Sequence, residues 1–213
     1  MKKHIYCKYK VLIIILLLLW RSDLLLAQDS GSSAFNLDIH AGITASQVQG
    51  DGLSGFNKLG FTGGLGITTT FSTKWDGGFE LNLIQKGSIK RPDPDAGNYT
   101  KYSMLLNYIQ IPVYGKYKVN SKLSFLAGPA IGILISSKEE DMNGELTGTP
   151  DFEKLELALI LGAEYSFSEK WAAQIRLEQS LLPIRSKGDY SSNTLKGRQY
   201  STVLGVLISY SIR

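Results

Sequence analysis

The stretch FNLDIHAGITA, residues 35–45, alternates apolar side chains with polar or small ones along its whole length. Successive side chains of a β-strand point to opposite faces, so this period of two predicts a strand with one apolar and one polar face. The alternation recurs down the chain, and no segment after Gln28 shows a sustained helical period. It predicts eight strands, over residues 35–46, 58–72, 77–88, 104–119, 122–136, 153–167, 171–182 and 198–212.

The connections between these strands alternate in length. The short ones are residues 72–76, 120–121 and 168–170. The long, polar ones are residues 47–57, 89–103, 137–152 and 183–197. In an up-and-down antiparallel barrel this order collects the short turns at one end and the long loops at the other, as in outer-membrane barrels. The predicted fold class is all-β: an eight-stranded antiparallel up-and-down transmembrane β-barrel with short periplasmic turns and long external loops.

Alternation alone does not say which face points inward, because a soluble lipocalin-like barrel has an apolar interior and a wet exterior. Three features favour the membrane arrangement. The apolar face gathers aromatic residues near the short turns, as a membrane interface selects: Phe35, Phe71, Trp75, Phe79, Tyr117, Phe125, Tyr165, Trp171 and Tyr210. The other face carries charges of both signs, which can pair in a closed lumen: Asp38, Glu80, Lys86, Lys116, Lys118, Glu156, Glu164, Arg176 and Glu178. That face is also rich in Gly, Ser and Thr, which fit a narrow interior.

Some positions depart from the regular pattern. Leu126, Leu134 and Ile160 fall on the nominally polar face of their strands. Pro112 and Pro129 lie inside predicted strands, where proline removes a hydrogen-bond donor from the ladder. We therefore expect local β-bulges at these two prolines.

The first 27 residues have the composition of a secretory signal peptide. A basic region, residues 1–10, precedes an unbroken apolar run over residues 11–20, which is too short for a spanning helix. We expect cleavage after Ala27, so that residues 1–27 are the signal peptide and 28–213 the outer-membrane β-barrel domain; an uncleaved anchor is the alternative. The single cysteine, Cys7, precedes the apolar run, so the barrel domain has no disulfide and no thiolate chemistry.

The formal net charge of +4 resides in the same leader. The leader holds five basic residues and one acidic residue of the 23 and 19 in the whole chain, which leaves 18 of each sign in residues 28–213. A nucleic-acid-binding function therefore loses its electrostatic support.

Several residue groups could in principle support chemistry. His40, the only histidine after the leader, lies two residues from Asp38 on the same face, and a hydrolase could use such a pair with a serine. We interpret His40 instead as a lumen residue satisfied by hydrogen bonds. The inward carboxylates Glu80, Glu164 and Glu178, with Arg176, are interpreted as ion pairs that fill the interior rather than as a glycosidase dyad.

The remaining motifs also favour structural interpretations. The acidic stretches 91–95 and 139–141 lack the spacing of a calcium loop and are interpreted as solvated loop charge. Residues 63–66, GGLG, lie within an alternating strand with no helix after them, which favours close packing over phosphate binding. We expect no catalytic, cofactor-binding or metal-binding residues.

Short motifs along the chain resemble those of a known family. They are GITAS (42–46) followed by GDGLSGFNKLGF (50–61), YIQIP (108–112) with KY (116–117), and AGP (127–129) with Gly132. With them, the whole of residues 28–213 resembles the PorT-like outer-membrane β-barrel proteins of diderm bacteria. The resemblance implies an integral outer-membrane barrel, connected in some members with protein secretion across that membrane and with gliding. It carries over no active-site residue.

The expected protein is therefore an integral component of the cell outer membrane and not an enzyme. An eight-stranded barrel is just wide enough for side chains to fill its interior, so we expect no diffusion pore and no small-molecule substrate. Its expected partners are outer-membrane lipid and other envelope or secretion-machinery proteins, contacted through the external loops. The alternatives are a secreted lipocalin-like carrier, which needs an apolar lumen, and an outer-membrane enzyme, which needs a reactive cluster at the external rim.

Overall fold

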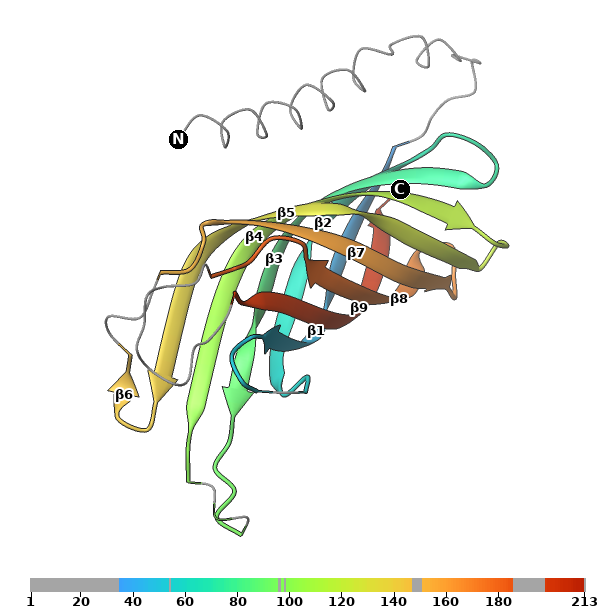
Figure 1. Ribbon diagram of the computed structural model, residues 1–213. Coiled ribbons are helices and arrows are strands. Elements are labelled where there is room, and N and C mark those ends of the chain that lie inside the picture. Colours follow the sequence, from blue (N-terminus) through green and yellow to red (C-terminus); the bar gives the residue numbers. More distant parts are fainter. Residues whose placement is uncertain are drawn as a thin grey trace, which may run out of the picture. The chain divides into compact units, whose positions relative to one another are not determined.

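The computed structural model describes residues 35–53, 55–95, 97, 99–146, 151–185 and 198–212 (Figure 1). The predicted signal peptide, its cleavage site and most of the predicted long connection 183–197 lie outside these residues. The strands are β1 Asn36–Gln49, β2 Lys58–Thr70, β3 Trp75–Lys90, β4 Tyr102–Lys118, β5 Leu123–Asp141, β6 Gly144–Glu145, β7 Leu155–Ser166, β8 Trp171–Ser180 and β9 Tyr200–Ile212. Among the described residues, no helix is long and apolar enough to cross a membrane.

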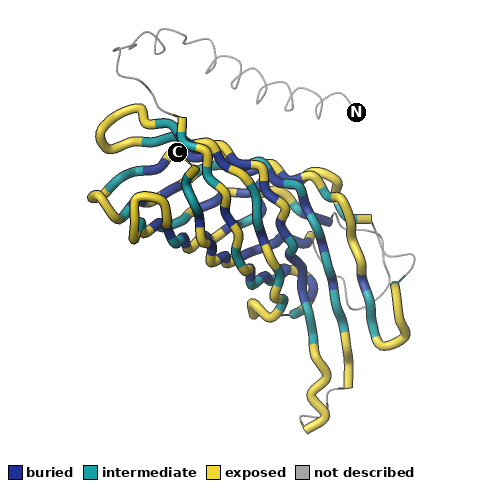
Figure 2. Tube along the Cα trace, turned by 180° about the vertical axis from the view of Figure 1, so that it is seen from behind, coloured by how far each residue is buried: buried dark blue, intermediate teal, exposed yellow. Residues whose placement is uncertain are grey.

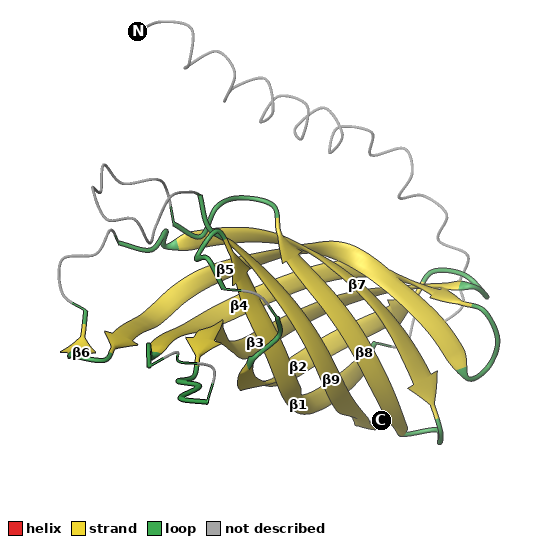
Figure 3. Cartoon of the chain, turned by 60° about the horizontal axis from the view of Figure 1, so that its bottom comes forward, coloured by secondary structure: helices red, strands yellow, loops and turns green. Residues whose placement is uncertain are grey.

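The strands form one antiparallel sheet that closes on itself. Its order is β4-β3-β2-β1-β9-β8-β7-β5, and β4 also pairs with β5, which completes an eight-stranded barrel (Figure 3). All eight predicted strands are present within a few residues of their expected bounds. The sequence pattern missed only β6, which adds two residues to the edge of β5 where β5 extends beyond β7.

The barrel has a distinct short-turn end and long-loop end. Residues 71–74, 119–122 and 167–170 make the three short turns, and the four longer connections lie at the opposite end. The start of β1 pairs with the end of β9, Leu37 with Ile212. The first and last strands of the barrel therefore begin and end at the short-turn end. The predicted alternation of long and short connections is confirmed.

Buried and exposed residues alternate along most of the strands (Figure 2). The buried ones face the lumen and the exposed ones face outward. Glu80 is 2% exposed and faces inward, whereas its neighbour Leu81 is 51% exposed and faces outward. The outer surface is therefore apolar and the lumen largely polar, which is the reverse of what a soluble carrier barrel needs. Leu126 and Ile160 nevertheless face inward, where they pack in one apolar cluster with Tyr114.

Aromatic side chains form the expected band at the short-turn end. Two ring pairs organise it: Trp75 with Tyr117 across β3 and β4, at 5.1 Å between centroids, and Trp171 with Tyr210 across β8 and β9, at 4.9 Å. Phe125 and the other predicted members of the band are exposed or half-buried on the outer face. This is where amphipathic rings meet a membrane–water interface.

Two rows of outward polar side chains mark the opposite boundary of the apolar surface. One row joins Gln85 to Asn107 at 3.1 Å and Asn107 to Ser136 at 2.8 Å. The other joins Gln49, Thr202 and Gln179 on the far side of the barrel, at 3.2 and 2.7 Å. Residues 75–85 of β3 and 171–179 of β8 therefore span the apolar surface, matching the 9–11 residues that a tilted strand needs to cross a bilayer.

The two prolines do not produce the bulges that we expected. β3 and β4 keep one register on both sides of Pro112, and β4 and β5 keep one register on both sides of Pro129. Each proline interrupts the ladder over two residue pairs, because one donor is missing, without adding a residue to the strand. The register shift lies elsewhere, opposite Asn107 and Tyr108, where β5 contains one extra residue, Ile135.

Leu81→Arg is expected to destabilise the protein in a bilayer by about 2–4 kcal/mol, the cost of an arginine on the lipid face near the midplane. Leu81 faces outward near the middle of the spanning part of β3, opposite Leu65. The matched control is Ile89→Arg, on the same strand but beyond Gln85, which should cost far less. Unfolding titrations in phospholipid vesicles measure both, and equal costs would mean that the membrane boundary is misplaced.

Candidate functional site

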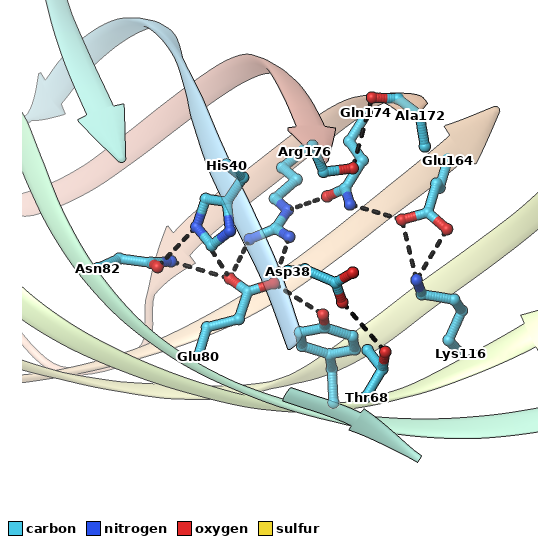
Figure 4. Close-up of polar contacts among 12 residues, drawn as sticks. Asp38, His40, Thr68, Glu80, Asn82, Lys116, Glu164, Ala172, Gln174 and Arg176 are labelled. Atoms are coloured by element: carbon cyan, nitrogen blue, oxygen red, sulfur yellow. Dashed lines mark hydrogen bonds and ion pairs between the residues drawn. The ribbon is translucent and has the colours of Figure 1, made fainter. Parts of the chain in front are cut away.

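The centre of the lumen is closed by a buried ion pair between β3 and β8. Both terminal nitrogens of Arg176 donate to the two carboxylate oxygens of Glu80, each at 2.6 Å (Figure 4). The hydroxyl of Tyr114 on β4 donates to the same carboxylate at 2.7 Å, and Arg176 Nε donates to Gln174 at 2.8 Å. Arg176 is only 6% exposed. Because β3 and β8 lie on opposite sides of the barrel, this layer of side chains crosses the lumen.

His40 extends this layer, and its hydrogen-bond partner is Asn82 rather than Asp38. Its Nε2 lies 2.7 Å from Asn82 Oδ1 and 3.7 Å from Glu80, and Asn82 donates in turn to Glu80 at 2.9 Å. The carboxylate of Asp38 accepts instead from the hydroxyl of Thr68 at 3.0 Å. The interpretation of His40 as a hydrogen-bonded lumen residue is confirmed.

A second charged layer lies towards the short-turn end. Lys116 Nζ contacts both oxygens of Glu164, at 2.7 and 2.9 Å, and Gln174 donates to the same carboxylate at 2.5 Å. Lys118 pairs with Asp76 at 2.6 Å nearer the rim. A polar cavity of about 150 Å³ extends from His40 past this layer to the short-turn rim, where Lys170 lines it.

A third charged layer lies on the long-loop side of Arg176. Lys86 is fully buried and bridges Glu156 of β7 at 2.5 Å and Glu178 of β8 at 2.8 Å. Gln110 donates to Glu178 at 2.6 Å, and the Ser201 hydroxyl donates to Glu156 at 2.7 Å. One cation thus holds two carboxylates together, with further donors on each, as a buried charge requires.

On the long-loop side of Lys86, a cluster of apolar side chains fills the lumen. The buried cluster consists of Val48, Ile84, Met104, Leu106, Tyr108, Ile184 and Val203. Ile184 comes from the connection after β8, whose backbone bonds to Glu153 and Gln199, each at 2.8 Å, and this fixes its side chain inside the barrel mouth. The chain itself therefore fills the long-loop end of the lumen.

A buried ion pair covers this apolar cluster. Arg185 donates to Glu139 of β5 at 2.6 Å, and its guanidinium lies 3.8 Å from the ring centroid of Phe152. Tyr102 also donates to Glu139. The interpretation of residues 139–141 as solvated loop charge is therefore wrong for Glu139, because β5 continues to Asp141 and turns this side chain inward.

The glycine-rich stretch 63–66 lies in β2, close to the neighbouring strand. A Cβ on Gly64 would lie 2.2 Å from the carbonyl oxygen of Leu81, and the Tyr114 ring similarly occupies the space beside Gly78. Such distances leave no room for a side chain, so these glycines admit the large residues that fill the lumen. The close-packing interpretation is confirmed.

The sequence pattern correctly predicted which face of the strands carries most of the charged residues of the lumen. All nine charged residues assigned to the inner face lie there, and eight of them, all except Asp38, form ion pairs in four groups. It missed the pair of Arg185 and Glu139, since both residues lie where connections were expected. Within the described ranges, no three His, Cys, Asp or Glu side chains are grouped closely enough to hold a metal ion.

A closed barrel with an apolar outer band, an aromatic rim and an ion-paired lumen is a transmembrane β-barrel. The family model of the outer membrane protein beta-barrel domain matches residues 26–186, and the chain belongs to this family. The protein is thereby located in the outer membrane. No curated protein matches the sequence.

Solved structures with the same architecture include two bacterial surface proteins. The attachment invasion locus protein Ail of Yersinia pestis is 15% identical, with a TM-score of 0.51 over 83% of this chain and 98% of its own. Neisserial surface protein A is 11% identical, with a TM-score of 0.48 over 86% of this chain and 100% of its own. At these identities the likeness to Ail supports the barrel fold alone.

Proposed function

We propose that this protein is a non-conducting, non-enzymatic component of the outer membrane that acts through contacts with other envelope proteins. The PorT resemblance extends the proposal to a role connected with protein secretion or gliding. The filled lumen is the observation that carries it. Three charged layers and two buried apolar clusters occupy the lumen, and each is built from side chains of more than one strand.

The long-loop end offers the larger surface for such contacts. Beyond the row of Gln85, Asn107 and Ser136, the strands β3, β4 and β5 continue for five residues each, or about 16 Å at 3.3 Å per residue. A groove of about 610 Å³ lies beside this wall. It is lined by Gly52, Leu53, Asn57, Ile89, Lys90, Arg91, Pro92 and Asp93.

The absence of a pore is tested by conductance. Barrels inserted in planar bilayers should give no current steps, although a shift in gel mobility on heating shows that they are folded. Regular current steps from folded barrels would overturn the non-conducting part of the proposal.

The proposed role in secretion or gliding is tested by deleting the gene. The deletion strain should show reduced secretion or gliding, and restoring the gene should recover it. An unchanged deletion strain would contradict this role without affecting the proposal of a closed barrel.

The long-loop end is expected to face the medium. Single cysteines at Asp95 and Asn143, both exposed in long connections, should react with a membrane-impermeant thiol reagent on whole cells. A cysteine at Lys170 in a short turn is the control and should react only after the cells are broken. The reverse labelling pattern would place the short turns outside.

A further inference from the structure

The three short turns share one construction, although they lie far apart in the sequence. Their residues are FSTKW (71–75), VNSKL (119–123) and FSEKW (167–171). Each has a serine or asparagine at its second position, a lysine at its fourth and a large apolar residue at its fifth. The fifth residue is the first of β3, β5 or β8.

The same backbone hydrogen bonds hold all three turns. The first two N–H groups of each turn donate to the carbonyl oxygen of the fifth residue, at 2.9–3.3 Å. The side-chain oxygen at the second position accepts from the lysine N–H, at 3.4 Å in the first turn, 2.9 Å in the second and 3.3 Å in the third. The lysine backbone is therefore part of the turn in every case.

The lysine carbonyl groups also tie each turn to a neighbouring strand. Those of Lys74, Lys122 and Lys170 accept from Lys118, Ser166 and Ser211 respectively, each at 2.8 Å. The lysine side chains take no part in these bonds and are exposed. No carboxylate in the described ranges forms an ion pair with any of the three.

The position of these ammonium groups relates them to the membrane surface. Each lysine immediately precedes a residue of the outer apolar face: Trp75, Leu123 or Trp171. Lys170 Nζ lies 6.0 Å from the ring centroid of Tyr210, whose ring packs at a tilt against Trp171, so this ammonium group lies at the aromatic band. The three turns, residues 71–74, 119–122 and 167–170, contain three lysines and one acidic residue, Glu169, so their net charge is +2.

We propose that Lys74, Lys122 and Lys170 form a ring that binds the phosphate groups of anionic phospholipids in the leaflet at the short-turn end. The shared backbone bonds hold each lysine at the short-turn rim, just before the first residue of a strand. Aromatic residues, which prefer the membrane interface, line the outer face at the same end. A basic residue near an anionic lipid surface is worth about 1 kcal/mol, or about a fivefold enrichment of anionic over neutral lipid beside it.

The natural tryptophans allow a direct test. Apart from Trp20 in the predicted leader, the only tryptophans are Trp75 and Trp171, each adjacent to a ring lysine. With Trp20→Phe in the full chain, fluorescence reports on lipids at the short-turn rim alone. In phosphatidylcholine vesicles, brominated phosphatidylglycerol should bind beside these residues about fivefold more strongly than brominated phosphatidylcholine, as measured by quenching. The preference should fall towards one in 1 M salt, where screening is strong.

Three variants separate the ring from general charge. Lys74→Gln, Lys122→Gln and Lys170→Gln together should abolish the preference, because the turns use only the lysine backbone. The corresponding triple arginine variant should retain it. Lys90→Gln, Arg91→Gln and Lys101→Gln remove the same charge from the long-loop end and should leave it unchanged. Folding of each is checked by the heat-dependent gel shift.

Clear outcomes contradict the proposal. Equal quenching by the two brominated lipids in the unaltered ring would overturn it. So would a preference that survives in the folded glutamine variant, or one that the long-loop variant loses to the same extent. If the glutamine variant does not fold, the salt dependence and the arginine variant still test the proposal. A lipid preference that persists in 1 M salt, or that the folded arginine variant loses, would contradict it, because binding by the lysine charges must be electrostatic.

Discussion

Glu80→Gln should lower the free energy of unfolding by about 3–5 kcal/mol, the usual cost of breaking a buried ion pair from one side. On the sequence alone this substitution should cost less than Leu81→Arg, unless it leaves Arg176 or a lysine without a partner. In the structure the Glu80 carboxylate holds both terminal nitrogens of Arg176 and the hydroxyl of Tyr114. Glutamine would leave the buried Arg176 charge without its ion-pair partner.

A double substitution isolates this effect. Arg176→Gln added to Glu80→Gln removes both charges, so the double variant should be more stable than Glu80→Gln alone. Urea titrations of the folded barrel in vesicles give the free energy of unfolding of the unaltered protein, of Glu80→Gln and of the double variant. A single-variant loss below about 1 kcal/mol, as at exposed pairs, would mean that water reaches this layer.

Lys86→Met should have an effect at least as large, because one cation serves two carboxylates. Lys86 is fully buried between Glu156 and Glu178, and methionine has similar bulk but no charge. Its loss leaves two negative groups close together inside the barrel, and we expect a destabilisation of about 3–5 kcal/mol or more. The same urea titration measures it.

The matched control neutralises the partners as well. Lys86→Met combined with Glu156→Gln and Glu178→Gln should recover much of the lost stability, since no charge is then stranded. Lys86→Arg keeps the charge and tests whether the site tolerates a larger cation. If the triple variant were no more stable than Lys86→Met, the loss would come from packing beside Tyr108 rather than from charge.

The strands and their faces could be predicted because period-two alternation is a local property of the chain. Glu80 and Leu81, for example, take opposite faces solely because they are neighbours in a strand. Partners inside the lumen are not local: Glu80 and Arg176 lie 96 residues apart, on strands that face each other across the barrel. Which inward residues meet depends on the stagger of the strands, which single-strand patterns do not contain.

The long-loop end was the least predictable part for a related reason. β5 gains a register shift and continues to Asp141, so Glu139 turns inward in a stretch that reads as polar loop. Ile184 and Arg185 enter the barrel mouth from a connection without alternation. Their burial depends on the shape of the opening that the other strands leave. The prediction of bulges at Pro112 and Pro129 was wrong. A strand can lose the hydrogen bond of one missing N–H donor and keep its register, without an extra residue.

The pairing of β1 with β9 has a consequence for how the chain enters the membrane. The hairpins β2–β3, β4–β5 and β7–β8 join neighbouring segments through four-residue connections and can form early. The β1–β9 seam instead joins residues 37–49 to 200–212, and Gly42 there approaches the opposite backbone too closely for any side chain. Until β9 is in place, β1 and β8 present open edges, which lipid does not tolerate. Insertion and closure therefore have to be completed together, by the whole domain.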